Sequence, residues 1–205
     1  MAKSNDLRFG ALGADYAHLC VDMQRMFCEP TDWHTPWMAK ILPAIEALVA
    51  THPKRTVFMR FVLEDRSDTA RGSWQRYYRR WSRMTRSQLD PSLIEIVPTL
   101  ARFVPPALVV DKKVYSPWFG SQLYKILINR GVDTIIVSGG ETDICVLATV
   151  LGAIDGGFRV IVVSDALCSS VDKLHDAIMT LYADRFNEQV ELATTDILLK
   201  ALPRR

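Results

Sequence analysis

Three residues have side chains that could cooperate in hydrolysis: Asp22, Lys112 and Cys145. Each of them ends or follows an apolar run that is typical of a buried strand. A thiol can attack a carbonyl carbon, and a carboxylate can take the thiol's proton and pass it to a leaving amine. An ammonium can stabilise the charges of both. Because side chains alternate along a strand, Lys112 and Lys113 face opposite ways and one of them can enter such a site.

Cys145 follows the turn Ser138–Thr142. If Thr142 caps the helix that begins there, Cys145 lies in the first helical turn, where the helix dipole favours a thiolate and lowers its pKa. Free N–H groups in that turn could hold a developing oxyanion. Each residue alone has a plainer explanation, since Cys145 fits a core, Asp22 can cap a helix and both lysines can be solvated. The catalytic interpretation is supported only when the three residues are considered together.

Strand and helix patterns alternate along the chain. Strands are expected at 18–23, 56–62, 107–111, 133–138, 159–164 and 189–193, and helices at 35–50, 120–129, 142–154, 172–183 and the end of the chain. This alternation predicts an α/β fold with three layers, α/β/α, around a mostly parallel six-stranded sheet. We expect one domain over residues 1–205, in which functional residues lie just past the carboxyl ends of the strands.

An arginine- and aromatic-rich insertion interrupts the alternation at about residues 64–90. Between residues 64 and 86 it holds seven arginines against three acidic residues, with Trp74, Tyr77, Tyr78 and Trp81 at helical spacing. One interpretation is a lid, or a wall from a neighbouring subunit, that recruits an anionic substrate. We favour the other interpretation, an amphipathic helix that packs its aromatic stripe on the core and leaves its arginines in water.

Composition narrows the class of protein. The net charge of +2 is too small to imply a nucleic-acid partner, and no apolar run reaches the length of a membrane span. The start of the chain is polar with no signal-peptide core, and the four cysteines show no paired spacing, so we expect a cytoplasmic protein with free thiols. We also expect a symmetric homodimer or homotetramer, as is common for small enzymes of this kind.

The sequence resembles the isochorismatase-like cysteine hydrolases, a Rossmann-like family, from about Leu19 to Leu192. Three segments carry the resemblance. Val21–Phe27 is similar to the family's Asp-x-Gln-x-x-Phe motif, Asp111–Ser116 to its Lys-x-x-Tyr-Ser motif, and Gly139–Val146 to its Gly-x-x-Thr-x-x-Cys-Val nucleophile turn. Val163–Ala166 and His175 also fit the family, and we expect His175 to be structural.

The resemblance implies catalytic roles for Asp22, Lys112 and Cys145, with a thioester intermediate on Cys145. It also implies a cis peptide at Gly140–Glu141 and an oxyanion hole formed by the backbone N–H groups of Glu141 and Cys145. Gln24, Phe27 and Tyr115 lie in the matched motifs, and Trp33 and Trp118 follow strand ends. We expect all five to bind substrate, although Pro117–Phe119 departs from the family pattern and leaves the shape of the pocket open.

The implied function is hydrolysis of a C–N bond in a small amide, carbamoyl or ureido compound. The nicotinamidase metal cluster has no counterpart, because no histidine lies between His52 and His175. We therefore expect no metal and no other cofactor. Two alternatives stay open: a non-catalytic binding protein on the same scaffold, and hydrolysis of an isochorismate-like vinyl ether, which does not need Cys145.

Overall fold

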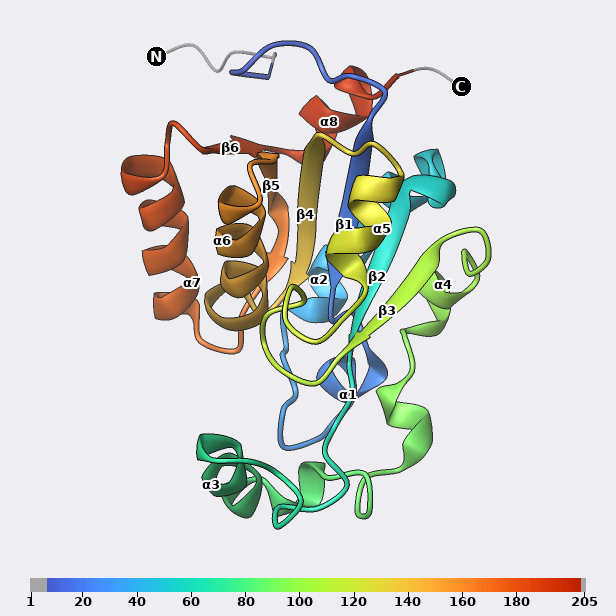
Figure 1. Ribbon diagram of the computed structural model, residues 1–205, viewed down its shortest axis with the longest axis vertical. Coiled ribbons are helices and arrows are strands. Elements are labelled where there is room, and N and C mark those ends of the chain that lie inside the picture. Colours follow the sequence, from blue (N-terminus) through green and yellow to red (C-terminus); the bar gives the residue numbers. More distant parts are fainter. Residues whose placement is uncertain (1–6, 204–205) are drawn as a thin grey trace.

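The computed structural model describes residues 7–203, which form one six-stranded parallel sheet with helices on both faces (Figure 1). The strands are β1 (Tyr16–Val21), β2 (Thr56–Phe61), β3 (Leu108–Lys112), β4 (Thr134–Gly140), β5 (Arg159–Cys168) and β6 (Val190–Ala193). Their spatial order is β3-β2-β1-β4-β5-β6, and every neighbouring pair is parallel. The predicted fold class is therefore confirmed.

The chain winds outward in both directions from the centre of this sheet. From β1 it continues to β2 and β3 on one side, and from β4 to β5 and β6 on the other. The connections on the two sides of β1 and β4 diverge, which opens a crevice at the carboxyl ends of these two strands. This is the edge of the sheet that lies toward α1 and α3 in Figure 1.

Helices cover the two faces of the sheet (Figure 1). α5 (Leu123–Asn129), α6 (Leu147–Asp155) and α7 (Asp172–Thr180) lie in front of the sheet in this view, and α2 (Met38–Thr51) and α8 (Thr195–Ala201) lie behind it. The remaining α-helices are α1 (Arg25–Cys28), α3 (Ser73–Arg80) and α4 (Pro98–Ala101). No helix within residues 7–203 is both long enough and apolar enough to cross a membrane.

The turns and short helical segments complete the chain. Single 3₁₀ turns cover Pro53–Arg55, Ser82–Met84 and Pro91–Ile94, and π-helical turns cover Thr142–Val146 and Leu181–Arg185.

Every residue of β1 and of β4 is buried, and successive residues of β1 enter the cores on opposite faces of the sheet. The two cores hold the central strands rigidly, so their carboxyl ends have fixed positions.

Two helix starts differ from the sequence-based expectation. α2 begins at Met38 and not at Thr35, because the Thr35 N–H donates to the Phe27 carbonyl in a turn that precedes the helix. Thr142 is not a side-chain cap, since it lies inside the π-helical turn that precedes α6. β5 is also longer than predicted, because Leu167 and Cys168 resume pairing with β4 beyond an irregularity.

A buried histidine in β1 predicts a dependence of stability on pH. His18 Nε2 lies 2.7 Å from Ser138 Oγ in β4, and burial lowers the pKa of His18 from 6.5 to about 4. Between these values the unfolded chain binds a proton that the folded chain does not, so stability is lost as the pH falls. We expect this group to remove about 3 kcal/mol from the free energy of unfolding between about pH 7 and pH 4, measured by urea denaturation.

The matched controls are His18→Asn and His34→Asn. His18→Asn keeps a polar side chain but removes the titration, and its unfolding free energy should vary less between the two pH values. His34 is exposed, so His34→Asn should keep the wild-type dependence. Equal losses in wild type and His18→Asn would contradict the prediction.

Candidate active site

Asp22, Lys112 and Cys145 meet at the carboxyl end of the sheet. Asp22 directly follows β1, Lys112 is the last residue of β3, and Cys145 lies in the π-helical turn after β4. The Lys112 ammonium nitrogen is 2.8 Å from Asp22 Oδ2 and 3.3 Å from Cys145 Sγ. Three side chains separated by up to 123 positions in the sequence, from 22 to 145, therefore form one connected group.

The backbone around Asp22 fixes the direction of its carboxylate. Asp22 has φ +49°, in the left-handed region that few residues other than glycine adopt, and its N–H donates to the Met59 carbonyl. In the neighbouring strand Gly139 has φ +111°, and a Cβ there would lie 2.1 Å from the Val21 carbonyl oxygen. Glycine is thus required where β4 passes closest to β1, directly beside Asp22.

The ion pair between Asp22 and Lys112 is almost completely buried. The exposed fractions of the two side chains are 2% and 0%. Burial alone would lower the pKa of Lys112, but attraction to Asp22 and Cys145 outweighs it and the pKa is raised. Burial raises the pKa of Asp22, and Lys112 offsets only part of that rise. Asp22 Oδ1 is buried with no hydrogen-bond partner, so one carboxylate oxygen is available to accept a proton.

The predicted low pKa of the Cys145 thiol is wrong. Burial, followed by repulsion between a thiolate and the Asp22 carboxylate, raises the pKa of Cys145 well above its ordinary value. Lys112 opposes this rise without cancelling it. Loss of water around the buried sulfur is the largest cause of this rise, and it favours the thiol over the thiolate.

Hydrogen bonds hold the turn that carries Cys145. The Thr142 hydroxyl donates to the Cys168 carbonyl and lies 2.9 Å from His175 Nδ1, which gives His175 a structural place. The Thr149 hydroxyl donates to the Cys145 carbonyl. The Gly140–Glu141 peptide bond, which precedes the turn, is cis. Glu141 and Cys145 thus enter the site on a tightly held segment.

A cavity of about 260 Å³ opens above Cys145. Of the five residues expected to bind substrate, Phe27, Trp33 and Tyr115 line it. The other lining residues are Asp32, His34, Phe61, Tyr77, Trp81, Glu141, Ile144, Cys145 and Ser170. Phe27 and Trp33 have nearly parallel rings whose centroids are 6.1 Å apart. The nucleophile candidate therefore faces a small pocket with aromatic walls.

Gln24 and Trp118 do not line this cavity, contrary to the sequence-based expectation. The Gln24 side chain is fully buried, accepts from the Phe61 N–H and donates to the carbonyls of Phe61 and Ile94. The Trp118 indole donates to the Thr149 carbonyl and packs against Phe158. The hydrogen-bonding groups of both side chains have partners within the protein, so both side chains support its structure.

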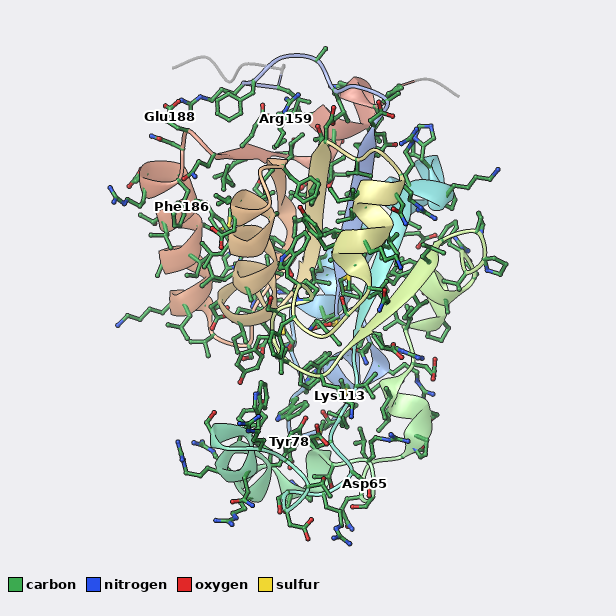
Figure 2. The ribbon with its side chains drawn as sticks, viewed as in Figure 1. Asp65, Tyr78, Lys113, Arg159, Phe186 and Glu188 are labelled. Carbon is green, nitrogen blue, oxygen red and sulfur yellow. The ribbon has the colours of Figure 1, made fainter. Side chains whose placement is uncertain are left out.

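The segment 64–90 supplies part of the cavity wall. Tyr77 of α3 and Trp81 at its end line the cavity, and Tyr77 also contacts Trp33 with 5.7 Å between ring centroids. Tyr78 is buried, its hydroxyl accepts from the Glu64 N–H, and Figure 2 labels it toward the same end of the molecule as Lys113. The aromatic stripe was visible in the sequence, but which of its rings face the cavity was not.

The arginines of this segment lie on its outer side. All seven are exposed: Arg66, Arg71, Arg76, Arg79, Arg80, Arg83 and Arg86. Arg66 pairs with Asp68, and Arg83 pairs with Asp32. The segment is therefore amphipathic in the structure, with its aromatic rings turned toward the protein and its arginines exposed to water. Within residues 7–203 no three His, Cys, Asp or Glu side chains converge as they would around a metal ion.

Comparison with known proteins identifies the family. Residues 16–194 match the model of the isochorismatase domain. The chain belongs to the isochorismatase family. A crystal structure of a cysteine hydrolase from Pseudomonas syringae is similar to this family member over 98% of both chains, with 27% identity and a TM-score of 0.81.

One curated protein and one further solved structure are also similar to this chain. This isochorismatase-family chain is 33% identical to maleamate amidohydrolase of Pseudomonas putida over 70 residues, which are 34% of the chain and 33% of the relative. N-carbamoylsarcosine amidase of Thermoplasma acidophilum shares the fold, with a TM-score of 0.73 and 22% identity over 89% of this chain and 97% of that one. The chain spans half or less of the curated relatives that it matches.

Proposed function

We propose that this protein is a cysteine hydrolase that cleaves a C–N bond of a small amide, carbamoyl or ureido compound. One observation carries the proposal: Cys145 lines a small aromatic cavity, and its Sγ is 3.3 Å from an ammonium that also contacts a buried carboxylate. This set supplies a nucleophile, a base and a cation. A similar protein, maleamate amidohydrolase of Pseudomonas putida, supports the same reaction type.

The first half of the reaction replaces the C–N bond with a C–S bond. As Cys145 Sγ attacks the substrate carbonyl carbon, its proton passes to Asp22, whose Oδ1 has no other partner. The raised thiol pKa favours transfer of the proton during attack and not before it. Asp22 then gives the proton to the leaving nitrogen, the C–N bond breaks, and ammonia or an amine departs from the thioester.

The second half restores the thiol. Asp22 takes a proton from a water molecule, and the oxygen of that water attacks the thioester carbonyl carbon. The C–S bond breaks, the sulfur regains the proton from Asp22, and a carboxylic acid or carbamic acid leaves. Asp22 therefore acts as base and acid in turn. The raised pKa of Asp22 suits this role, because burial favours the protonated form that carries the proton between the two steps.

Lys112 and two backbone groups complete the proposed machinery. The Lys112 ammonium offsets the negative charge that moves between the sulfur and the Asp22 carboxylate, each of which it contacts. The N–H groups of Glu141 and Cys145 are the candidates for holding the oxygen of the tetrahedral intermediate. Both residues line the cavity.

A panel of small amides and ureides tests the proposed reaction. Each compound is incubated with the protein, ammonia release is measured, and the reaction is quenched in acid for mass spectrometry of the peptide that contains Cys145. We expect ammonia from at least one compound and an acyl adduct on that peptide alone. Ammonia release with the adduct on another residue, or hydrolysis of a vinyl ether without any adduct, would contradict the proposed mechanism.

A further inference from the structure

The charged residues that line the cavity are acidic. Asp32 and Glu141 contribute carboxylates, and none of the lining residues, all within the described part of the chain, is lysine or arginine. Glu141 Oε1 accepts a hydrogen bond from the Ser170 N–H, and no cation within residues 7–203 is paired with it. Asp32 pairs with Arg83, whose side chain is 80% exposed. The lining of the cavity therefore includes two acidic residues and no lysine or arginine.

The cations nearest to the cavity are occupied or face outward. The Lys112 side chain has no exposed surface and contacts Asp22 and Cys145, so it cannot pair with a charged group of the ligand. The arginines of the segment 64–90 are exposed and lie on its outer side. An anionic substrate would lose its water in the cavity without gaining an ion pair, which is unfavourable.

The remaining wall is aromatic. Six of the twelve lining residues are Phe, Tyr or Trp: Phe27, Trp33, Phe61, Tyr77, Trp81 and Tyr115. Aromatic faces attract cations through the quadrupole of the ring, and several rings together bind ammonium groups. Phe61 shows the same preference within the protein, because the Lys112 ammonium lies 4.7 Å from its ring centroid. Rings combined with a free carboxylate are the features that recognise a positive group.

We propose that the substrate is a small amide whose non-reacting part carries a positive charge, such as an ammonium or trimethylammonium group. This inference rests on the proposed function, because only a hydrolase would act on the bound amide as a substrate. The preference of the cavity for a cation is a separate property. Glu141 precedes Cys145 by four positions, and both line the cavity. A positive group beside Glu141 and an amide carbonyl beside Cys145 would therefore occupy the same cavity.

Binding to a Cys145→Ala protein tests the preference without hydrolysis. Isothermal titration calorimetry is run with three probes of similar size: trimethylammonioacetamide, its neutral isostere tert-butylacetamide, and the anion malonamate. We expect the cationic amide to bind at least about tenfold more tightly than the neutral isostere, and malonamate to bind more weakly than both. In the Glu141→Gln background the preference for the cation should fall by at least about threefold.

Glu188→Gln is the matched control. It removes the same charge from the opposite end of the molecule, where Glu188 is labelled in Figure 2, and its side chain is 78% exposed. The preference for the cation should not change in this variant. Equal or tighter binding of the neutral or anionic probe, or no binding of any probe, would overturn the inference.

The two proposals fail in different ways. If the cationic probe binds preferentially but wild-type protein releases no ammonia from any amide, the cation preference is retained and the hydrolase proposal is rejected. If wild-type protein hydrolyses neutral and anionic amides while the Cys145→Ala protein shows no preference among the probes, hydrolysis is retained and the cation preference is rejected.

Discussion

Replacing Cys145 by alanine is expected to lower turnover of the preferred amide by at least about a thousandfold, by analogy with other nucleophile deletions. The thiol forms the covalent intermediate in the proposed mechanism, and neither Asp22 nor Lys112 can replace it as nucleophile. The side chain is small and nearly buried, so its loss should leave the fold intact. The measurement is the rate of ammonia release, together with circular dichroism of both proteins.

Cys28→Ala is the control for this variant. Cys28 is another free cysteine, lies in α1 and does not line the cavity, so ammonia release should stay close to that of wild type. If Cys145→Ala releases ammonia as fast as wild type, the thiol is not the nucleophile. That result would reject the thioester mechanism and indicate an amide hydrolase that does not use Cys145.

Replacing Lys112 by methionine is expected to reduce the free energy of unfolding by about 3–5 kcal/mol at neutral pH. Methionine fills much the same space, but it leaves the Asp22 carboxylate buried without its partner ammonium. The protein must then either keep an uncompensated charge or protonate Asp22, and both are unfavourable. Urea denaturation of the two proteins measures the difference, and ammonia release should be lost as well.

The neighbouring lysine provides a close control. Lys113 is 64% exposed and its weak ion pair with Glu64 is on the surface, so Lys113→Met should change stability by less than about 0.5 kcal/mol. Adding Asp22→Asn to Lys112→Met should recover part of the lost stability, because the buried charge is gone. A Lys112→Met protein as stable as Lys113→Met would show that the buried ion pair matters little.

Sequence patterns were sufficient to predict the sheet and the meeting of the three reactive residues. The strands around Asp22 and Lys112 are apolar runs, and parallel strands bring their carboxyl ends to one edge. The residues at those strand ends can then be read directly from the amino-acid sequence. The family resemblance added the choice of Lys112 over Lys113.

Features that depend on distant parts of the chain could not be predicted. Gln24 seemed free to bind a ligand, but its amide is used by the backbone of Phe61, 37 positions away. Trp118 is used by the Thr149 carbonyl, 31 positions away. The direction of the Cys145 pKa shift depends on burial by many neighbours, whereas the sequence indicated only the helix start.

The aromatic segment at residues 64–90 could be predicted only in part. Its helical spacing predicted an amphipathic helix with rings on one side, and α3 has that form. The sequence did not show that Tyr77 and Trp81 reach the cavity, because the cavity is formed with residues of other loops. Tyr77 contacts two of them, Trp33 and Tyr115. Local periodicity indicates which face is apolar, while tertiary packing decides what that face covers.

The reacting groups and the surrounding rings come from different parts of the chain. Strand ends hold Asp22, Lys112 and Cys145, whereas Tyr77 and Trp81 belong to an excursion between β2 and β3. Mutations that accumulate in this excursion can therefore change which molecules enter the cavity and leave the residues of the proposed covalent chemistry unchanged. For protein engineers, grafting an alternative excursion between residues 64 and 90 is therefore the direct route to a new specificity on this scaffold.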